Sequence, residues 1–288
     1  MTIRVIPRID VKGPNLVKGV HLEGLRVLGR PERFARHYYE HGADELIYMD
    51  VVASLYGRNS LLDLVERTAR TVFVPLTVGG GLRSVEGIRD VLRAGADKVA
   101  LNTAVLDDPE LISGAARRFG SSTIVVSVEA VRQSDGRWEA MTDSGRESSG
   151  VDAVGWAARA AELGAGEIMI TSVDREGTGR GFDLELVDAI TRATNVPVIA
   201  AGGAGRSDDV VAAAELDVSA VSIASMLHYG IASSLATHDD IEHEGNVEYL
   251  RDAAVPTRFE VTTVEDLKEA LVEAGFVVRP TADAADAP

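Results

Sequence analysis

Short runs of aliphatic and β-branched residues alternate with amphipathic stretches along most of the chain, which predicts a repeated strand-then-helix order. The pattern predicts eight strands, at 4–10, 45–51, 73–78, 98–102, 122–129, 167–173, 196–201 and 220–224. Helical periodicity covers 31–42, 84–95, 109–120, 152–164, 184–194 and 207–216, with Ser, Asp or Pro near most starts and Gly near many ends. Strands that alternate with helices form a parallel sheet.

Eight such units within roughly 250 residues favour a (β/α)₈ barrel. A doubly wound sheet fits less well, because no G-x-G-x-x-G dinucleotide fingerprint follows the first strand. An internal repeat supports the barrel. The run from Gly42 to Ile47 recurs 122 residues later, from Gly164 to Met169. Two further motifs repeat with the same offset. One lies around the turns at 79–81 and 202–205, and the other lies in the strands at 99–103 and 221–225. The chain is therefore predicted to consist of two fused half-barrels.

The alternation of predicted strands and helices ends near residue 230. Residues 1–280 are expected to form a single barrel domain that carries a polar, acidic insertion at 231–260 and a closing helix at 264–274. Residues 281–288 are typical of a disordered tail. From residue 231 onward the chain has 13 acids and 4 bases, so much of its negative charge lies at this end.

The whole chain carries 45 acids and 29 bases, a formal charge of −16. This balance argues against nucleic-acid or anionic-membrane binding, although a local basic pocket for a phosphorylated metabolite remains compatible with it. There is no cysteine, which excludes disulfides, thiolate metal sites and a cysteine nucleophile, and the six histidines show no H-E-x-x-H spacing. We expect no metal and no cofactor. Without a long apolar run or a secretion signal at the start, we expect a cytoplasmic protein.

In a barrel of this type, chemistry takes place where the strands end at their carboxyl side. Asp10 ends the first strand and Glu129 ends the fifth, and these two strands face each other across the mouth. Two carboxylates so placed are candidates for a general acid and a general base acting on one substrate. The alternative is that each caps a loop or pairs with an arginine.

Glycine-rich turns follow the third and seventh strands, and polar residues end the neighbouring strands. Glycine lets backbone N–H groups approach an oxyanion, and the following helix presents its N-terminus, so these turns suit phosphates. The candidate anion-binding residues are Gly80, Gly81, Asn102 and Thr103 on one side and Gly202, Gly203, Ala224 and Ser225 on the other, with Glu176, Gly177 and Thr178 of the loop after strand six assisting the second group. The implied ligand carries a phosphate at each end, unless the glycines only form tight turns.

The opposite end of the barrel has its own charged set. Arg4, Glu45, Lys98 and Glu167 each open a strand, so they are expected to meet at the barrel floor as a ring of ion pairs. Charge pattern alone is compatible with a purely stabilising network.

Several motifs together resemble the cyclase subunit of imidazole glycerol phosphate synthase (HisF-like). They are Ile6-Pro7-x-x-Asp10-Val11-Lys12, Val17-Lys18-Gly19-Val20, Gly42-Ala43-Asp44-Glu45-Leu46, the run from Pro75 to Ser84, Ala94-Gly95-Ala96-Asp97-Lys98-Val99 and the run from Pro197 to Gly205. The resemblance covers about 1–230 and resumes near 261–280. It implies a barrel lyase of histidine biosynthesis that takes ammonia from a partner glutaminase. With that ammonia, the enzyme converts a bisphosphorylated ribulosyl-formimino nucleotide to imidazole glycerol phosphate and an aminoimidazole carboxamide nucleotide.

The resemblance also implies roles for individual residues. Asp10 matches a catalytic aspartate, Lys18 and Asp50 match further active-site positions, and the floor residues Arg4, Glu45, Lys98 and Glu167 match an ammonia gate.

This chain departs from the family pattern at four positions and in one segment. Glu129 and Glu176 stand where the pattern has Asp, Arg8 where a small residue or Cys is usual, and Ser122 where Gln is usual. The 231–260 insertion has no counterpart. Relatives with such changes resemble paralogues that deliver ammonia to sugar nucleotides and build acetamidino groups on surface glycans, so this function stays as an alternative.

Two other classes are less favoured. A non-catalytic gating subunit would not need Asp10 and two phosphate pockets, and a related carbohydrate isomerase would not need an ammonia gate.

Overall fold

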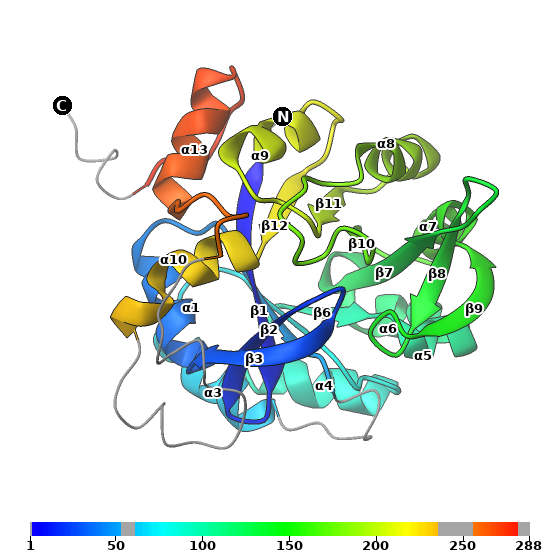
Figure 1. Ribbon diagram of the computed structural model, residues 1–288. Coiled ribbons are helices and arrows are strands. Elements are labelled where there is room, and N and C mark those ends of the chain that lie inside the picture. The colour runs from blue at the N-terminus through cyan, green and yellow to red at the C-terminus, as the bar shows by residue number, and fades with distance from the viewer. Residues whose placement is uncertain (1, 53–60, 236–255, 282–288) are drawn as a thin grey trace.

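The computed structural model describes residues 2–52, 61–235 and 256–281. Its core is a closed barrel of eight parallel strands, seen nearly end-on in Figure 1. In order around the barrel these are β1 (Arg4–Lys12), β4 (Leu46–Asp50), β5 (Leu76–Gly79), β6 (Lys98–Leu101), β7 (Ile124–Arg132), β10 (Glu167–Ser172), β11 (Val198–Ala201) and β12 (Ala220–Ile223). Pairing of β10 with β7 and of β12 with β1 completes the circle. The predicted (β/α)₈ barrel is confirmed.

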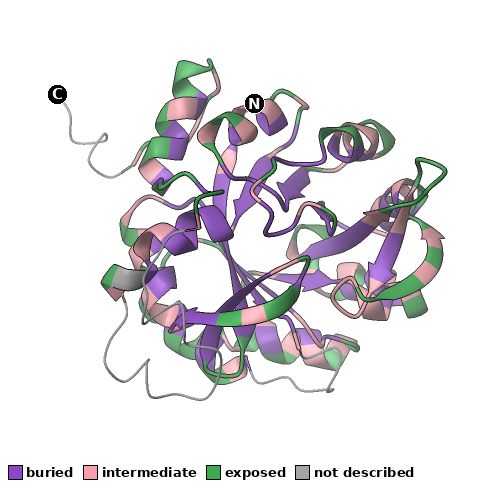
Figure 2. Ribbon diagram, in the orientation of Figure 1, coloured by how far each residue is buried: buried purple, intermediate pink, exposed green. Residues whose placement is uncertain are grey.

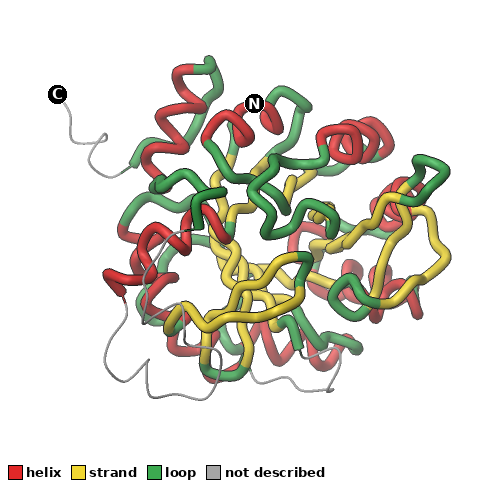
Figure 3. The backbone as a smooth tube through the Cα atoms, viewed as in Figure 1, coloured by secondary structure: helices red, strands yellow, loops and turns green. Residues whose placement is uncertain are grey.

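Helices surround the strands on the outside, as Figure 3 shows. They are α1 (Pro31–Glu40), α3 (Leu62–Ala69), α4 (Val85–Arg93), α5 (Thr103–Asp107), α6 (Glu110–Phe119), α7 (Ala153–Glu162), α8 (Leu184–Ala193), α9 (Ser207–Ala214), α10 (Ser225–Leu235) and α13 (Val264–Glu273). Several begin where the sequence predicts, because Ser84, Asp152 and Asp183 accept hydrogen bonds from the exposed amides of the first turn. A short 3₁₀ turn, η1 (Ser121–Thr123), precedes β7.

Each helix buries one apolar face against the barrel and leaves the other in water, so buried positions concentrate on the strands and exposed ones on the outer helix faces (Figure 2). No helix in the described part of the chain is long and apolar enough to cross a membrane.

Two antiparallel hairpins extend the barrel strands and were not predicted. Strands β2 (Asn15–Val20) and β3 (Glu23–Gly29) continue from β1, and β8 (Trp138–Thr142) and β9 (Glu147–Asp152) continue from β7. Strand β2 pairs with the end of β1 and β8 pairs with the end of β7, while β3 pairs with β2 and β9 pairs with β8. Figure 1 shows the β2–β3 hairpin in front of the barrel and the β8–β9 hairpin beside it.

The internal repeat falls on equivalent places of the two halves. The repeated motifs lie on β4 and β10, on β5 and β11, and on β6 and β12, which are four strands apart around the barrel. Of the expected insertion at 231–260, residues 231–235 belong to α10, while 236–255 lie outside the described residues, as does the expected tail from 282 onward.

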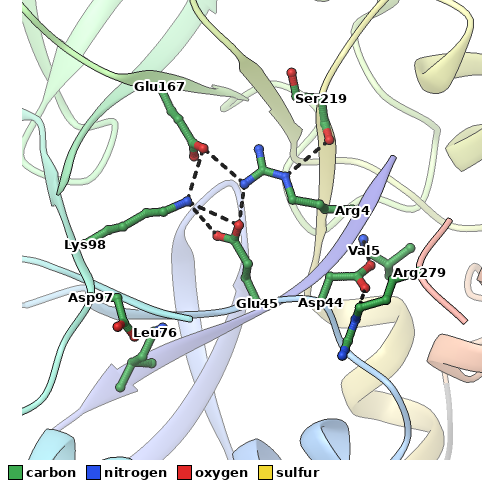
Figure 4. A network of polar contacts seen from close by, with 10 residues as sticks. All are labelled: Arg4, Val5, Asp44, Glu45, Leu76, Asp97, Lys98, Glu167, Ser219 and Arg279. Carbon is green, nitrogen blue, oxygen red and sulfur yellow. Dashed lines mark hydrogen bonds and ion pairs between the residues drawn. The ribbon is translucent and has the colours of Figure 1, made fainter. Parts of the chain in front are cut away.

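The two ends of the chain meet at a seam beside the barrel floor. The Asp44 carboxylate accepts from the Val5 amide at 2.8 Å, from Lys268 Nζ at 2.7 Å and from Arg279 Nε at 2.9 Å. Figure 4 shows Asp44 between Val5 and Arg279. The residue after Asp44 is Glu45 of the floor, so this carboxylate ties the last helix and the C-terminal segment to the residues that lead into β4.

Candidate functional site at the barrel mouth

Strand register decides which side chains point into the barrel. Alternate residues of a strand face the same side, so Arg4, Ile6, Arg8 and Asp10 form one inward-facing file on β1. Register places Ser222 beside Ile6 on the neighbouring β12, and Glu129 on β7 beside Thr171 on β10. Because Arg4 begins β1 and Asp10 lies near its end, the barrel interior has charged side chains both at the floor and at the mouth.

Asp10 lies at the mouth, buried, with both carboxylate oxygens paired. Oδ1 accepts from Arg8 Nε at 2.8 Å and Oδ2 accepts from Lys18 Nζ at 2.7 Å. Burial by itself would raise the pKa of Asp10, but the two cations outweigh it and lower the pKa to about 2. Asp10 is therefore ionised at neutral pH.

Glu129 has the opposite electrostatic environment, although it lies at the same mouth. Its Oε2 accepts from Asn102 Nδ2 at 3.0 Å, and no ion pair forms with it among the residues that the structure describes. Burial is the main cause that raises the pKa of Glu129, to about 7; the Asp10 charge also raises it, while Arg8 and the Gly145 amide lower it. One carboxylate is thus fixed as an anion and the other titrates near neutrality, a division typical of acid–base sites.

Lys18 reaches the mouth from the β2–β3 hairpin. Its ammonium group also pairs with Glu176 of the loop after β10, and both acids offset the desolvation that would otherwise lower its pKa. The hairpin and the loop touch closely, because a Cβ on Gly177 would lie 2.3 Å from the Gly19 carbonyl oxygen. Glycine is therefore required at 177, where φ is also +70°.

One pocket, which we name the first pocket, opens where β4, β5 and β6 end. It is lined by the predicted residues Asp50, Gly80, Gly81, Asn102, Thr103 and Glu129, and also by Leu22, Arg83, Ser127 and Ser144, which the sequence did not single out. Gly80 has a φ of +101°, and a Cβ there would lie 2.4 Å from the Asp50 carbonyl oxygen, so the chain bends here in a way only glycine permits.

A second pocket opens where β10, β11 and β12 end. It is lined by the predicted residues Glu176, Gly177, Gly202, Gly203, Ala224 and Ser225, together with Arg8 and Ser222. Thr178 does not line either pocket; its hydroxyl donates to the Arg175 carbonyl at 2.6 Å and so shapes the loop instead. The two pockets lie on opposite sides of the barrel, as the repeat predicts.

Sequence reasoning missed Arg8 as a site residue, noting it only as a departure from a pattern. The inward alternation along β1, with Arg4 and Asp10 on the same face, was the signal that could have placed it.

At the opposite end of the barrel, four charged side chains converge (Figure 4). Arg4 Nη1 pairs with Glu45 and, at 3.1 Å, with Glu167, while Lys98 Nζ lies 3.1 Å from a carboxylate oxygen of each glutamate. The two cations and two anions alternate in a closed ring across the barrel axis. No set of His, Asp or Glu side chains suited to a metal ion occurs within the described ranges.

Comparison with known proteins agrees with this geometry. The family model described as "Histidine biosynthesis protein" matches residues 4–233. A protein of Legionella pneumophila named imidazole glycerol phosphate synthase subunit HisF is 59% identical over 72% of this chain and 98% of its own length. Proteins of the same name from Bifidobacterium adolescentis and a Synechococcus strain are 47% and 48% identical, each over 85% of this chain and over 98% and 95% of their own lengths. The chain therefore belongs to the histidine biosynthesis protein family that contains the HisF subunits of imidazole glycerol phosphate synthase.

Proposed function

We propose that this chain is the cyclase subunit of an imidazole glycerol phosphate synthase. It uses ammonia to cleave and cyclise a bisphosphorylated ribulosyl-formimino aminoimidazole carboxamide nucleotide, with imidazole glycerol phosphate as one product. The similarity to HisF subunits supports this activity over nearly the full length of those relatives. We expect the enzyme to work in the cytoplasm.

One observation carries the proposal: two glycine-lined pockets share a mouth with two carboxylates of different charge state. Pockets on opposite sides suit a substrate with a phosphate at each end. Glu129 lines the first pocket and Arg8, the partner of Asp10, lines the second, so the reacting centre would lie between the phosphates.

The charge states suggest a division of labour. Ammonia that adds to an electrophilic carbon acquires a positive charge and must then lose a proton. Asp10, an anion at working pH, is suited to stabilise that positive charge, and Glu129, with a pKa of about 7, is suited to take the proton and return it to the leaving nitrogen.

We propose that ammonia enters through the floor from a glutaminase subunit docked there. The ring of Arg4, Glu45, Lys98 and Glu167 would then act as a gate, since it lies across the axis that leads to the mouth. The absence of cysteine from this chain fits a partner that supplies the glutaminase nucleophile.

The gate is tested by Lys98→Met. Removing Lys98 leaves Glu45 and Glu167 with Arg4 as their shared cation, and breaking a largely buried pair typically costs ~3–5 kcal/mol. We expect ammonium-dependent turnover to persist while the ratio of glutamine-dependent to ammonium-dependent rates falls by roughly one order of magnitude. Steady-state rates with the cognate glutaminase, on glutamine and on ammonium salt, measure this.

The matched control is Arg159→Met on α7, where an exposed cation pairs with Glu162 and contributes little. An unchanged ratio in Lys98→Met would show that the ring does not gate ammonia, and glutamine hydrolysis by the purified chain alone would remove the need for a partner.

A second function is favoured by specific residues. Arg8 places a guanidinium inside the barrel beside Asp10, and Glu129 and Glu176 are each one methylene longer than aspartate. These features fit a paralogue that transfers ammonia to a sugar nucleotide in acetamidino-glycan synthesis.

Complementation separates the two functions. The gene is supplied to a histidine auxotroph that lacks its own cyclase subunit, with and without the cognate glutaminase, and growth without histidine is expected. A soluble, folded protein that fails to support growth even with its partner would transfer the assignment to the amidating function.

A further inference from the structure

Arg8 is a buried arginine whose hydrogen-bonding groups are only partly used. Its side chain is 3% exposed. Nε donates to Asp10, and Nη1 donates to the Thr171 hydroxyl at a long 3.4 Å. Nη2 has no hydrogen-bond partner among the residues that the structure describes. Leaving a buried charged donor without a partner costs free energy, so Nη2 is a donor available to an acceptor atom of a ligand.

The unused edge belongs to the wall of the second pocket. Ser222 of β12, which lines the same pocket, also has a buried hydroxyl with no partner in the described part of the chain. Around these two side chains are the Gly202 and Gly203 turn and the first residue of α10, Ser225. Glycine amides, a helix start, a hydroxyl and a guanidinium edge together are a donor set for an oxyanion.

The backbone beneath Arg8 is held in place from the other side. His228 of α10 bonds through Nε2 to the Arg8 carbonyl at 2.8 Å and through Nδ1 to the Tyr38 hydroxyl at 2.6 Å. Burial lowers the pKa of His228 to about 4, so the ring is neutral: Nε2–H donates to the Arg8 carbonyl and Nδ1 accepts from Tyr38. Because α10 begins at Ser225 in the second pocket, His228 joins the Arg8 backbone to a helix that contributes to the pocket wall.

We propose that Arg8 Nη2 and Ser222 Oγ bind a phosphate oxygen in the second pocket, which makes Arg8 a residue for substrate recognition. This proposal rests on the proposed function for the bisphosphorylated substrate. It adds a bridge that the function does not require: the guanidinium that holds Asp10 through Nε holds the substrate phosphate through Nη2. Occupation of the pocket thereby fixes Asp10 relative to the substrate.

Charge in the pocket supports the need for Arg8. Glu176 lines the same pocket and would repel a phosphate, while its Lys18 partner is shared with Asp10. Two cations, Arg8 and Lys18, balance the two carboxylates of Asp10 and Glu176. Without Arg8 this cluster has a net negative charge, which disfavours binding of a dianion.

Inorganic phosphate tests this without any turnover. The full-length chain, labelled with ¹⁵N, is titrated with phosphate while the amides of Gly203 and Ser225 report on the second pocket and those of Gly81 and Thr103 on the first. In Arg8→Gln we expect the dissociation constant at the second pocket to rise roughly ten- to a hundredfold, the effect of losing a hydrogen bond to a charged group. The first pocket should keep its affinity.

Two further variants protect the test. Ser222→Ala removes only the hydroxyl and should weaken the second pocket by a smaller factor, and Arg8→Lys keeps the charge beside Asp10 but lacks the second N–H edge. If Arg8→Gln does not fold, weaker phosphate binding by both of these variants upholds the proposal and unchanged binding by both overturns it. The proposal is also wrong if phosphate leaves the second-pocket amides of the unaltered chain undisturbed, or if Arg8→Gln binds there as tightly as the unaltered chain.

The outcome is independent of complementation. A chain that fails to support histidine synthesis but loses second-pocket affinity in Arg8→Gln would retain the Arg8 site with a different phosphorylated substrate. Growth on the unaltered gene with no effect of Arg8→Gln would retain the function and reject the site.

Discussion

Asp10→Asn is expected to lower kcat with saturating ammonium salt by ~10²–10³, the usual effect of removing a preorganised group that stabilises charge in the transition state. The substitution keeps the shape of the side chain but removes the charge that Arg8 and Lys18 neutralise. Because the pKa of Asp10 is about 2, the carboxylate is an anion over the whole working range, and the loss should be similar from pH 6 to pH 9. Rates are measured with ammonium salt alone, so docking of the glutaminase plays no part.

Thermal unfolding distinguishes lost chemistry from lost structure. A lowered pKa stabilises the folded protein above the unfolded value of about 4, and this stabilisation disappears as pH falls toward 2, so the variant should melt lower at pH 7. Asp135→Asn, an exposed aspartate paired with Arg137, is the matched control and should change neither rate nor melting. A folded Asp10→Asn variant with intact turnover would reject a catalytic role.

Glu129→Gln should abolish the rise of kcat/KM with pH that the unaltered enzyme is expected to show. At constant free ammonia, kcat/KM of the unaltered chain is expected to rise with pH through about 7, because Glu129 must be ionised to accept a proton. The variant should lose ~10²–10⁴ in rate and lose this rise with it. Glu129→Asp, which moves the carboxylate by roughly a C–C bond length, should keep the pH dependence but lose up to about 10²-fold in rate.

Glu129→Gln should raise the thermal stability of the folded protein at pH 8, whereas Asp10→Asn should lower it at pH 7. The raised pKa of Glu129 contributes stability that is present below about pH 4.5 and lost as pH rises through about 7. At pH 8 the folded protein holds a buried carboxylate that Gln replaces with a neutral group, so Glu129→Gln is expected to melt higher than the unaltered chain at pH 8. A variant that melts higher and turns over less cannot owe its loss to unfolding. A pH profile that is the same in both proteins would assign the titration to another group.

Much of the fold follows from local sequence, because buried parallel strands and capped helices have strong patterns. All eight barrel strands were predicted, within a few residues at most boundaries, although β5 starts at Leu76 and not at 73, since Phe73 is 74% exposed. The hairpins β2–β3 and β8–β9 could not be predicted in this way. Strands β2 and β8 pair with the nearby ends of β1 and β7, and β3 and β9 pair only with β2 and β8. Whether such short segments form strands depends on this pairing more than on the intrinsic preference of their residues.

The candidate site was predicted less completely than the fold. Strand ends and glycine turns marked the carboxylates and both pockets, because those positions follow from the barrel itself. The charge state of each acid did not follow. Asp10 and Glu129 are equivalent in the sequence pattern and both are buried. Their pKa values differ because Asp10 pairs directly with Arg8 and with Lys18, and Lys18 lies on a hairpin that was not predicted.

The seam at Asp44 has a consequence for how the protein is made. A chain leaves the ribosome N-terminus first, so β1 and β4 are available long before Lys268 and Arg279, which complete the partners of Asp44. Until then this carboxylate keeps the Val5 amide as the only one of its three inter-element donors. Glu45 follows Asp44 directly and precedes β4, so the segment that carries this floor residue gains its last two partners only when synthesis is nearly finished. A chain that stops short of residue 268 would contain all four floor residues but would lack both cations that pair with Asp44.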